Sequence, residues 1–117
     1  MTVDSRPRSV YELIGREWGV PVTWAEAPMV TELGTSDVVI FSNNPRRVAL
    51  LAVNLSPNIV YIRPQRPAAL SIGIRLNPNG GSFGAVWRDD MGLPALEWHG
   101  VATAAGSAVY TLEVVIR

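Results

Sequence analysis

Residues 71–87 read SIGIRLNPNGGSFGAVW, and this stretch indicates a β-rich fold. Before the turn, Ile72, Ile74 and Leu76 occupy every second position, and the alternation returns in FGAVW after it. A period of two is typical of a strand with one buried face. The Asn and Gly residues of NPNGGS between the two runs tolerate the positive φ angles that tight turns need. We therefore predict two antiparallel strands joined as a hairpin.

Further short apolar runs lie on both sides of this hairpin. SDVVIF (36–41) and IVYIRP (59–64) are rich in β-branched residues and are bounded by turn signals. RRVALLAVNL (46–55) is apolar at almost every position after its arginines, which favours a central strand buried on both faces. The tight SPN link predicts that this strand pairs with IVYIRP as a second hairpin.

Two more strands are expected at EWHGVAT (97–103) and SAVYTLEVVI (107–116), joined by a short turn. Apolar residues of the last run share one face of the strand, namely Tyr110, Leu112, Val114 and Ile116. About seven strands separated by turns rather than helices predict a mainly β fold. The expected architecture is an antiparallel β-sandwich, for which a jelly roll is one candidate arrangement.

The N-terminal segment has a different character. Residues 1–8 have no apolar period and are expected to form a loose tail. SVYELIGREWG (9–19) predicts a short helix, because Ser9 and Glu12 form the pattern of a capping box and Gly19 supplies a C-terminal stop.

The next stretch, VPVTWAEAPMVTELGTS (20–36), contains two prolines and no sustained period, and predicts an extended connector arm. The expected division is a tail, helix and arm over residues 1–36, followed by a β-sandwich domain over residues 37–117. A capped amphipathic helix outside a β-core can dock on a partner or on its own sandwich, and the sequence leaves both open.

Composition excludes several classes of function. The 117 residues include ten basic and ten acidic side chains with no formal net charge, which argues against nucleic acid or an anionic membrane as the main partner. No cysteine is present, so disulfides and cysteine–zinc sites are excluded. No apolar run approaches the roughly 20 residues that span a bilayer, and the first residues lack a signal-peptide pattern. Synthesis as a soluble cytoplasmic protein is expected.

The densest group of titratable residues consists of Asp89, Asp90, Glu97 and His99. Glu97 and His99 would share one face of a strand and could bind a metal, and paired carboxylates could act as general acid and base. However, Asp-Asp in a Gly-Pro loop is typical of a solvated turn, and a single histidine leaves a transition metal short of ligands. NPNGGSFG leads into a strand and lacks the lysine of a phosphate loop. No catalytic residue, metal or cofactor is predicted.

Other residues are candidates for contact with a partner. The N-terminal segment and the arginines before the most apolar strand supply Val10, Leu13, Ile14, Trp18, Trp24, Arg46 and Arg47. The two arginines could protect a sheet edge from self-association or pair with carboxylates of a partner. A ligand rim that stacks sugars on aromatic rings is the alternative, with Trp87, Asp89, Asp90 and Trp98 as its candidates.

Residues 43–115 contain the runs NNPRRVALLAVNLSPNIVYIRP, GIRLNPNGGSF and EWHGVATAAGSAVYTLEVV. An Arg-containing strand and an Asn-Leu-Ser turn precede a Val-Tyr strand, and a Gly-rich turn and a closing Ala-Ala-Gly-Ser hairpin follow. This order resembles a sequence style of small virion proteins of tailed bacteriophages. The resemblance implies a non-enzymatic homo-oligomer of the virion that binds viral capsid or other virion proteins, such as a capsid decoration protein or a head or tail surface subunit.

Three hypotheses of function follow. The first is a virion structural protein that decorates or stabilises a repeating protein lattice. The second is a carbohydrate- or receptor-binding module of a phage particle, and the third is a small metal-dependent hydrolase.

Overall fold

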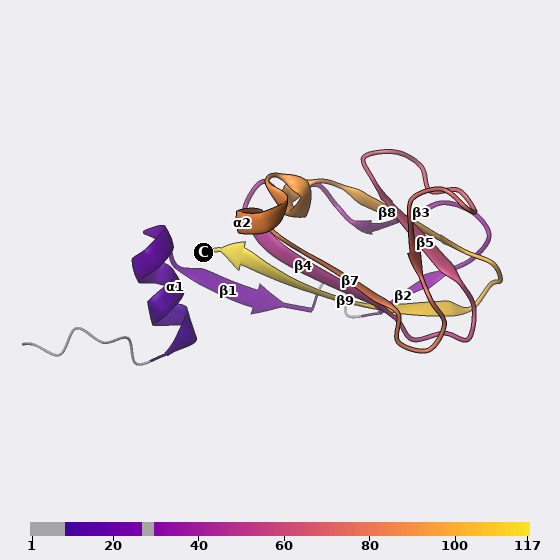
Figure 1. Ribbon diagram of the computed structural model, residues 1–117, viewed down its shortest axis with the longest axis horizontal. Helices are drawn as coiled ribbons and strands as arrows, with labels where there is room; N and C mark the ends of the chain where they lie inside the picture. The colour runs from indigo at the N-terminus through magenta and orange to yellow at the C-terminus, as the bar shows by residue number, and fades with distance from the viewer. Residues whose placement is uncertain (1–8, 27–29) are drawn as a thin grey trace, which may run out of the picture.

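The structure, a computed structural model, describes residues 9–26 and 30–117, apart from the side chains of Tyr11, Ile14 and Trp18. The described residues form two antiparallel sheets that pack against each other, with short helices at one end (Figure 1). The elements in chain order are α1 (Val10–Trp18), β1 (Val22–Ala25), β2 (Val30–Leu33), β3 (Val38–Phe41), β4 (Arg47–Asn54), β5 (Val60–Pro64), β6 (Ile74–Leu76), β7 (Ser82–Val86), α2 (Trp87–Asp90), the 3₁₀ turn η1 (Leu93–Ala95), β8 (Trp98–Ala102) and β9 (Ser107–Ile116).

The strand order is that of a jelly roll. One sheet has the order β1-β9-β4-β7, with β2 also paired to β9, and the other has the order β3-β8-β5-β6. The antiparallel pairs β2–β9, β3–β8, β4–β7 and β5–β6 are nested inside one another. The chain therefore folds as one long hairpin that is rolled into two sheets, which is how a jelly roll is built. The predicted mainly β sandwich is confirmed.

The core lies between the two sheets and follows from the period-two alternation of the strands. In β4, Leu50 and Ala52 are buried and belong to the core, whereas Ala49, Leu51 and Val53 between them are partly exposed. Trp98 from β8 is 1% exposed, and its ring centroid lies 5.1 Å from that of Phe83 on β7. The largest core side chain thus fills the space between the sheets.

Helix α1 begins and ends where the sequence predicts. The Ser9 hydroxyl accepts a hydrogen bond from the Glu12 backbone N–H at 3.1 Å, and Gly19 adopts a left-handed conformation at φ 73°. Val10 and Leu13 are 69% and 43% exposed. Figure 1 shows α1 beyond the end of the sheet, beside β1 and the C-terminus. The predicted tail over residues 1–8 lies outside the described residues.

The predicted arm is wrong in its extent. Residues 22–33 contain β1 and β2, which both pair with β9, and Leu33 is 1% exposed in the core. The sandwich therefore begins at Val22, and not at residue 37. These short strands carry little period of their own, and they form because β9 offers its backbone along their whole length.

Three predicted hairpins are also wrong. β4 and β5 lie in different sheets, as do β6 and β7, and β8 and β9. Each turn is present, but it carries the chain from one sheet to the other. Because Asn and Gly permit the same backbone angles in both settings, turn chemistry alone does not distinguish a hairpin from a sheet-to-sheet crossing.

The loop predicted after β7 contains α2 and η1. Pro94 of η1 is buried, and the Trp98 indole Nε1 donates to the Leu93 carbonyl at 2.9 Å. This helical segment closes one end of the sandwich. None of the described helices has the length and hydropathy needed to cross a bilayer.

Candidate protein-binding face

The outer surface of the sheet that contains β4 and β9 is apolar from edge to edge. The register aligns Trp24, Val114, Ala49 and Val86 in one row across four strands. A second row contains Leu112 and Leu51. Because Leu50, Ala52 and Ala85 at the alternate positions belong to the core, these rows point away from it. We define the apolar face by its residues Trp24, Val30, Ala49, Leu51, Val53, Val86, Tyr110, Leu112, Val114 and Ile116.

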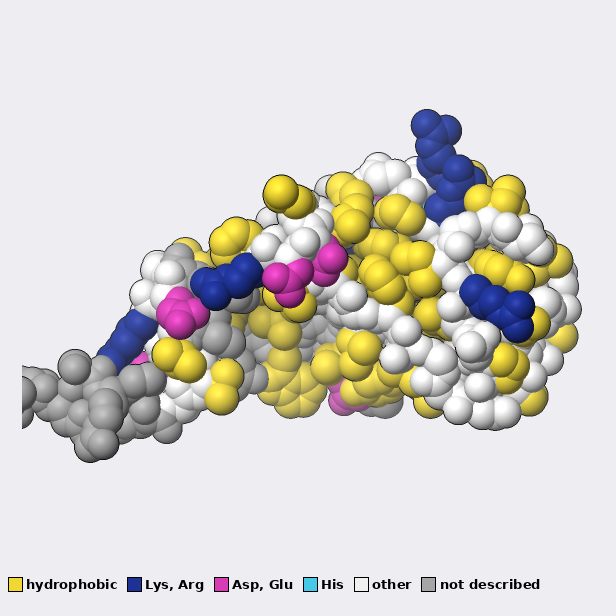
Figure 2. Space-filling view, in the orientation of Figure 1, with side chains coloured by type: hydrophobic (Ala, Val, Ile, Leu, Met, Phe, Trp, Pro, Cys, Tyr) yellow, Lys and Arg dark blue, Asp and Glu magenta, His cyan; other side chains and the backbone are white. Residues whose placement is uncertain are grey.

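Several side chains of the apolar face are open to solvent. Trp24, Val30 and Val86 are 53%, 48% and 39% exposed. A shallow hollow of about 90 Å³ lies in its middle and is lined by Ala49, Leu50, Leu51, Leu112, Glu113 and Val114. Figure 2, which views the molecule from one side, shows hydrophobic side chains over the strands and acidic groups mainly towards the helical end. Soluble monomers rarely leave so continuous an apolar surface uncovered.

Among the described strands of this sheet, the outward acidic side chains lie at the β1/β2 edge. Glu32 on β2 lies opposite Ala108, and Glu26 follows β1. The hydroxyl of Tyr110 is hydrogen-bonded to the Glu26 carboxylate, and this bond, together with burial and the negative charge of Glu26, raises the pKa of Tyr110. The outward positions of β9, β4 and β7 carry no charged side chain.

Arg47 does not belong to a surface for partners. Its side chain is buried, and Nε donates to Glu113 Oε2 at 2.6 Å. The Nη1 and Nη2 groups donate to the backbone carbonyls of Pro94, Leu96 and Ser42, and the guanidinium carbon lies 5.0 Å from the centre of the Phe41 ring. The prediction that Arg47 protects an edge or meets a partner is wrong, because β4 is a central strand and the guanidinium turns inward.

Arg46 remains at the surface. Its Nε donates to the Ile116 carbonyl at 3.2 Å, and its backbone N–H donates to Asn44 Oδ1. A cleft of about 360 Å³ opens beside the buried pair and is lined by Val39, Ile40, Phe41, Ser42, Asn44, Arg47 and Glu113. Because the donors of Arg47 are directed to groups of its own chain, the cleft presents no free cation to an anionic ligand.

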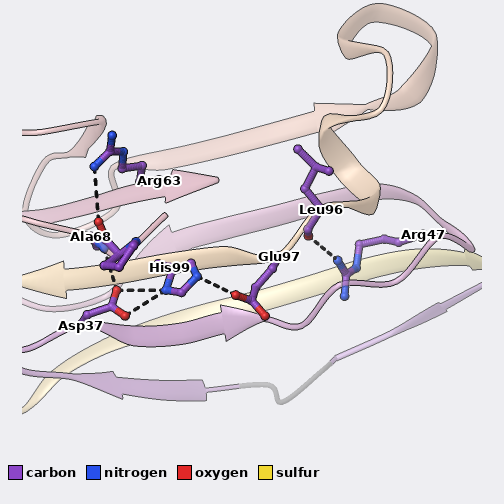
Figure 3. A network of polar contacts seen from close by, with 8 residues as sticks. Asp37, Arg47, Arg63, Ala68, Leu96, Glu97 and His99 are labelled. Carbon is purple, nitrogen blue, oxygen red and sulfur yellow. Dashed lines mark hydrogen bonds and ion pairs between the residues drawn. The ribbon is translucent and has the colours of Figure 1, made fainter. Parts of the chain in front are cut away.

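His99 lies between two carboxylates on the other sheet (Figure 3). Its Nδ1 is 2.9 Å from Asp37 Oδ2, and its Nε2 is 2.7 Å from Glu97 Oε1. Asp37 Oδ1 also accepts the Ala68 backbone N–H at 2.7 Å, which ties the segment after β5 to this cluster. Burial lowers the pKa of His99, but the hydrogen bonds and negative charges of Asp37 and Glu97 outweigh it and raise the pKa above 6.5.

Glu97 and His99 come together as the sequence indicates, but Asp89 and Asp90 do not join them. The third member is Asp37, which is 62 residues from His99 in the chain. Both imidazole nitrogens are directed at carboxylates, which suits a structural ion cluster. Within the described residues, no three His, Asp or Glu side chains form a group that could hold a metal ion.

One of the two aromatic rings predicted for the alternative ligand rim is buried. Trp98 is 1% exposed and its indole N–H is bonded to Leu93, so it cannot stack on a sugar. Trp87 is 43% exposed at the start of α2, and Asp90 accepts the Val86 backbone N–H at 2.9 Å. Asp89 lies at the surface of α2. Two of the four candidates thus have structural roles, and a rim built on both rings is wrong.

The other predicted contact residues are divided between two places. Trp24 is on the apolar face, and Val10 and Leu13 lie exposed on α1, while the side chains of Ile14 and Trp18 lie outside the described residues. The apolar face as a unit was not predicted. The sequence did indicate that Tyr110, Leu112, Val114 and Ile116 share one face of the last strand. Only the strand register shows that residues of β4 and β1 continue this face.

Comparisons of this chain with protein families, with curated proteins and with solved structures found no match.

Proposed function

We propose that this protein is a virion structural protein, a jelly-roll subunit that acts by binding other protein subunits of a phage particle as a capsid decoration or head–tail surface component. The observation that carries the proposal is the uncovered apolar face, which is typical of a subunit of a larger protein assembly. A sheet face of this composition costs free energy while it is in water, and burial against protein recovers roughly 25 cal/mol for each Å² of apolar surface. A subunit of an assembly has such a surface because neighbouring subunits bury it.

Two further observations support this class of protein. Helix α1 presents Val10 and Leu13 to solvent, at 69% and 43% exposure, at the end of the molecule. The second is the resemblance of residues 43–115 to small virion proteins, which selects a viral particle among the possible assemblies. Weak contacts that repeat over a lattice gain avidity without any single strong site.

A co-sedimentation experiment tests this function. Purified protein is mixed with capsids of the phage that encodes it. The fraction that pellets with the capsids is measured for the wild type and for the double variant Val10→Ser, Leu13→Ser. We expect the wild type to pellet with capsids and the double variant to pellet several-fold less, because the variant removes the exposed apolar side chains of α1. Leu70→Ser is the control, since Leu70 is 47% exposed in the segment between β5 and β6, away from α1.

Mass spectrometry of purified particles gives an independent answer. Peptides of this chain should be present at many copies per particle. Their absence from particles, together with no pelleting of the wild type, would reject the virion assignment. Binding to intact host cells that is lost in Trp87→Ala would instead support the receptor-binding alternative.

A further inference from the structure

We infer that the apolar face is covered by a second copy of this chain, which stacks its own β1/β2-β9-β4-β7 sheet on it across a two-fold axis. This inference rests on the proposed function as an assembly protein and names the first partner in that assembly. It leaves α1, with Val10 and Leu13, for contact with the lattice.

The size of the face fits such a dimer. The sheet is four strands wide, and β9 is 10 residues long. β4 has 8 residues, β7 has 5, and β1 and β2 have 4 each, so with strands about 4.8 Å apart and a rise of about 3.4 Å per residue the face measures about 500 Å² in projection. A stable interface of standard size buries about 800 Å² of accessible surface on each partner, and the accessible surface of a sheet face exceeds its flat projection because the side chains protrude.

The composition of the face favours a copy of itself over a charged partner. The outward positions of β9, β4 and β7 are Ala108, Tyr110, Leu112, Val114, Ile116, Ala49, Leu51, Val53, Ser82, Gly84 and Val86. An acidic or basic partner would meet no opposite charge there. A second copy brings an apolar sheet of the same kind, and two sheets stack about 10 Å apart with their strands within about 30° of each other.

The position of the acidic residues selects the axis. Glu26 and Glu32 lie at the β1/β2 edge, and the opposite edge is formed by β7. A two-fold axis parallel to the strands places the β1/β2 edge of one copy over the β7 edge of the other. An axis across the strands would place the acidic edges over each other, which is unfavourable for like charges. With the first axis, Trp24 of one copy faces Val86 of the other, because both lie in the same row of the sheet.

Mass measurement in solution tests the dimer. Size-exclusion chromatography with light scattering should give twice the chain mass of 12.7 kDa for the wild type. Leu51→Glu and Leu112→Glu should each give the chain mass, because a carboxylate in the middle of the interface would be buried without a partner. Leu70→Glu, the same change at an exposed site away from the face, should remain a dimer. If a central variant fails to fold, Trp24→Glu replaces it, because Trp24 is 53% exposed, and this variant should also give the chain mass.

Cross-linking tests the axis, and the absence of cysteine from the chain makes single thiols specific. A short bis-maleimide should join two chains of the double variant Trp24→Cys, Val86→Cys. The single variant Trp24→Cys should give little product. Equal cross-linking of the single variant would reject the proposed axis.

The outcomes separate this inference from the proposed function. A wild type that stays at the chain mass at every concentration overturns the dimer, even if it pellets with capsids. A wild-type dimer whose mass is unchanged by Leu51→Glu, Leu112→Glu and Trp24→Glu also overturns it. A dimer that dissociates in these variants but never pellets with capsids supports the inference and counts against the virion assignment.

Discussion

Arg47 and Glu113 form an ion pair of 2.6 Å inside the sandwich, although one begins β4 and the other lies in the second half of β9. The side chains of the two residues are only 3% and 11% exposed. Arg47 also donates to carbonyls of Pro94, Leu96 and Ser42, so the pair links the central strands of one sheet to the helical end and to the residue that follows β3.

Removing one partner of this pair should destabilise the fold strongly. Glu113→Leu leaves a buried cation without its counter-ion, and we expect the free energy of unfolding to fall by about 3–5 kcal/mol. Arg47→Met leaves both Glu113 and the backbone carbonyls without donors. The double variant should be more stable than Arg47→Met alone, because no buried carboxylate remains. Urea unfolding of the four proteins measures this coupling, and strictly additive losses would contradict it.

Trp98 should be the most costly aromatic residue to remove. Trp98→Ala opens a cavity between the sheets and should lower the free energy of unfolding by about 3–5 kcal/mol. Trp98→Phe keeps most of the packing and loses the hydrogen bond to Leu93, so its loss should be smaller. Leu70→Ala, at a 47% exposed position, is the control and should change stability by less than about 0.5 kcal/mol. Thermal unfolding orders the three variants, and a tolerated Trp98→Ala would contradict the core assignment.

Asn54 should not tolerate a change to aspartate. Its side chain is fully buried, Nδ2 donates to the carbonyls of Asn58, Leu76 and Asn77, and Oδ1 accepts from Ser56. In Asn54→Asp a carboxylate oxygen replaces the donor and faces carbonyl oxygens, so we expect a loss of about 3 kcal/mol at neutral pH. Lowering the pH should restore part of the lost stability, because a protonated carboxyl can donate a hydrogen bond to one of these carbonyls. Asn43→Asp, at an exposed site, is the control for the same chemical change.

The His99 cluster predicts a specific dependence of stability on pH. Because the pKa of His99 is raised above 6.5 in the folded protein, the protonated imidazole is stabilised by folding. This contribution is complete below pH 6.5 and is lost as the pH rises through the folded-state pKa. Thermal unfolding temperatures measured between pH 6 and pH 9 should therefore decrease for the wild type over that window.

His99→Gln supplies the control for this pH dependence. Glutamine can still donate a hydrogen bond to a neighbouring carboxylate, but it does not titrate in this range. The variant should be less stable than the wild type at pH 6, and the difference should shrink at higher pH. A difference that is the same at pH 6 and pH 9 would show that His99 carries no titrating contribution. Arg63 lies opposite His99 in the sheet.

Sequence patterns predicted the parts of this structure that depend on near neighbours. Ser9 and Gly19 bound α1 because capping needs only residues within one turn. The shared face of the last strand followed from alternation within ten residues, and it is the outer surface of β9. The sandwich class followed from the number of short strands and the lack of long helices.

Features that depend on distant residues were missed. β1 and β2 are strands because β9 pairs with them, and nothing within residues 22–33 required this. The sequence placed Arg47 at a surface because Glu113, its counter-ion, is 66 residues away. Asp37 reaches His99 for the same kind of reason. An identical turn composition also serves a hairpin and a crossing between sheets, so the strand pairs adjacent in sequence were predicted wrongly.

The position of β9 has a consequence for biosynthesis. It is translated after every strand that it joins, yet it lies between β4 and the β1/β2 edge. The sheet therefore cannot be completed until β9 has emerged from the ribosome. Until then, the apolar strands made earlier lack their central pairing partner. Such long-range closure is slow compared with helix formation, typically about milliseconds to seconds. Truncating the chain within β9 should thus yield aggregates in the cell rather than a smaller folded domain.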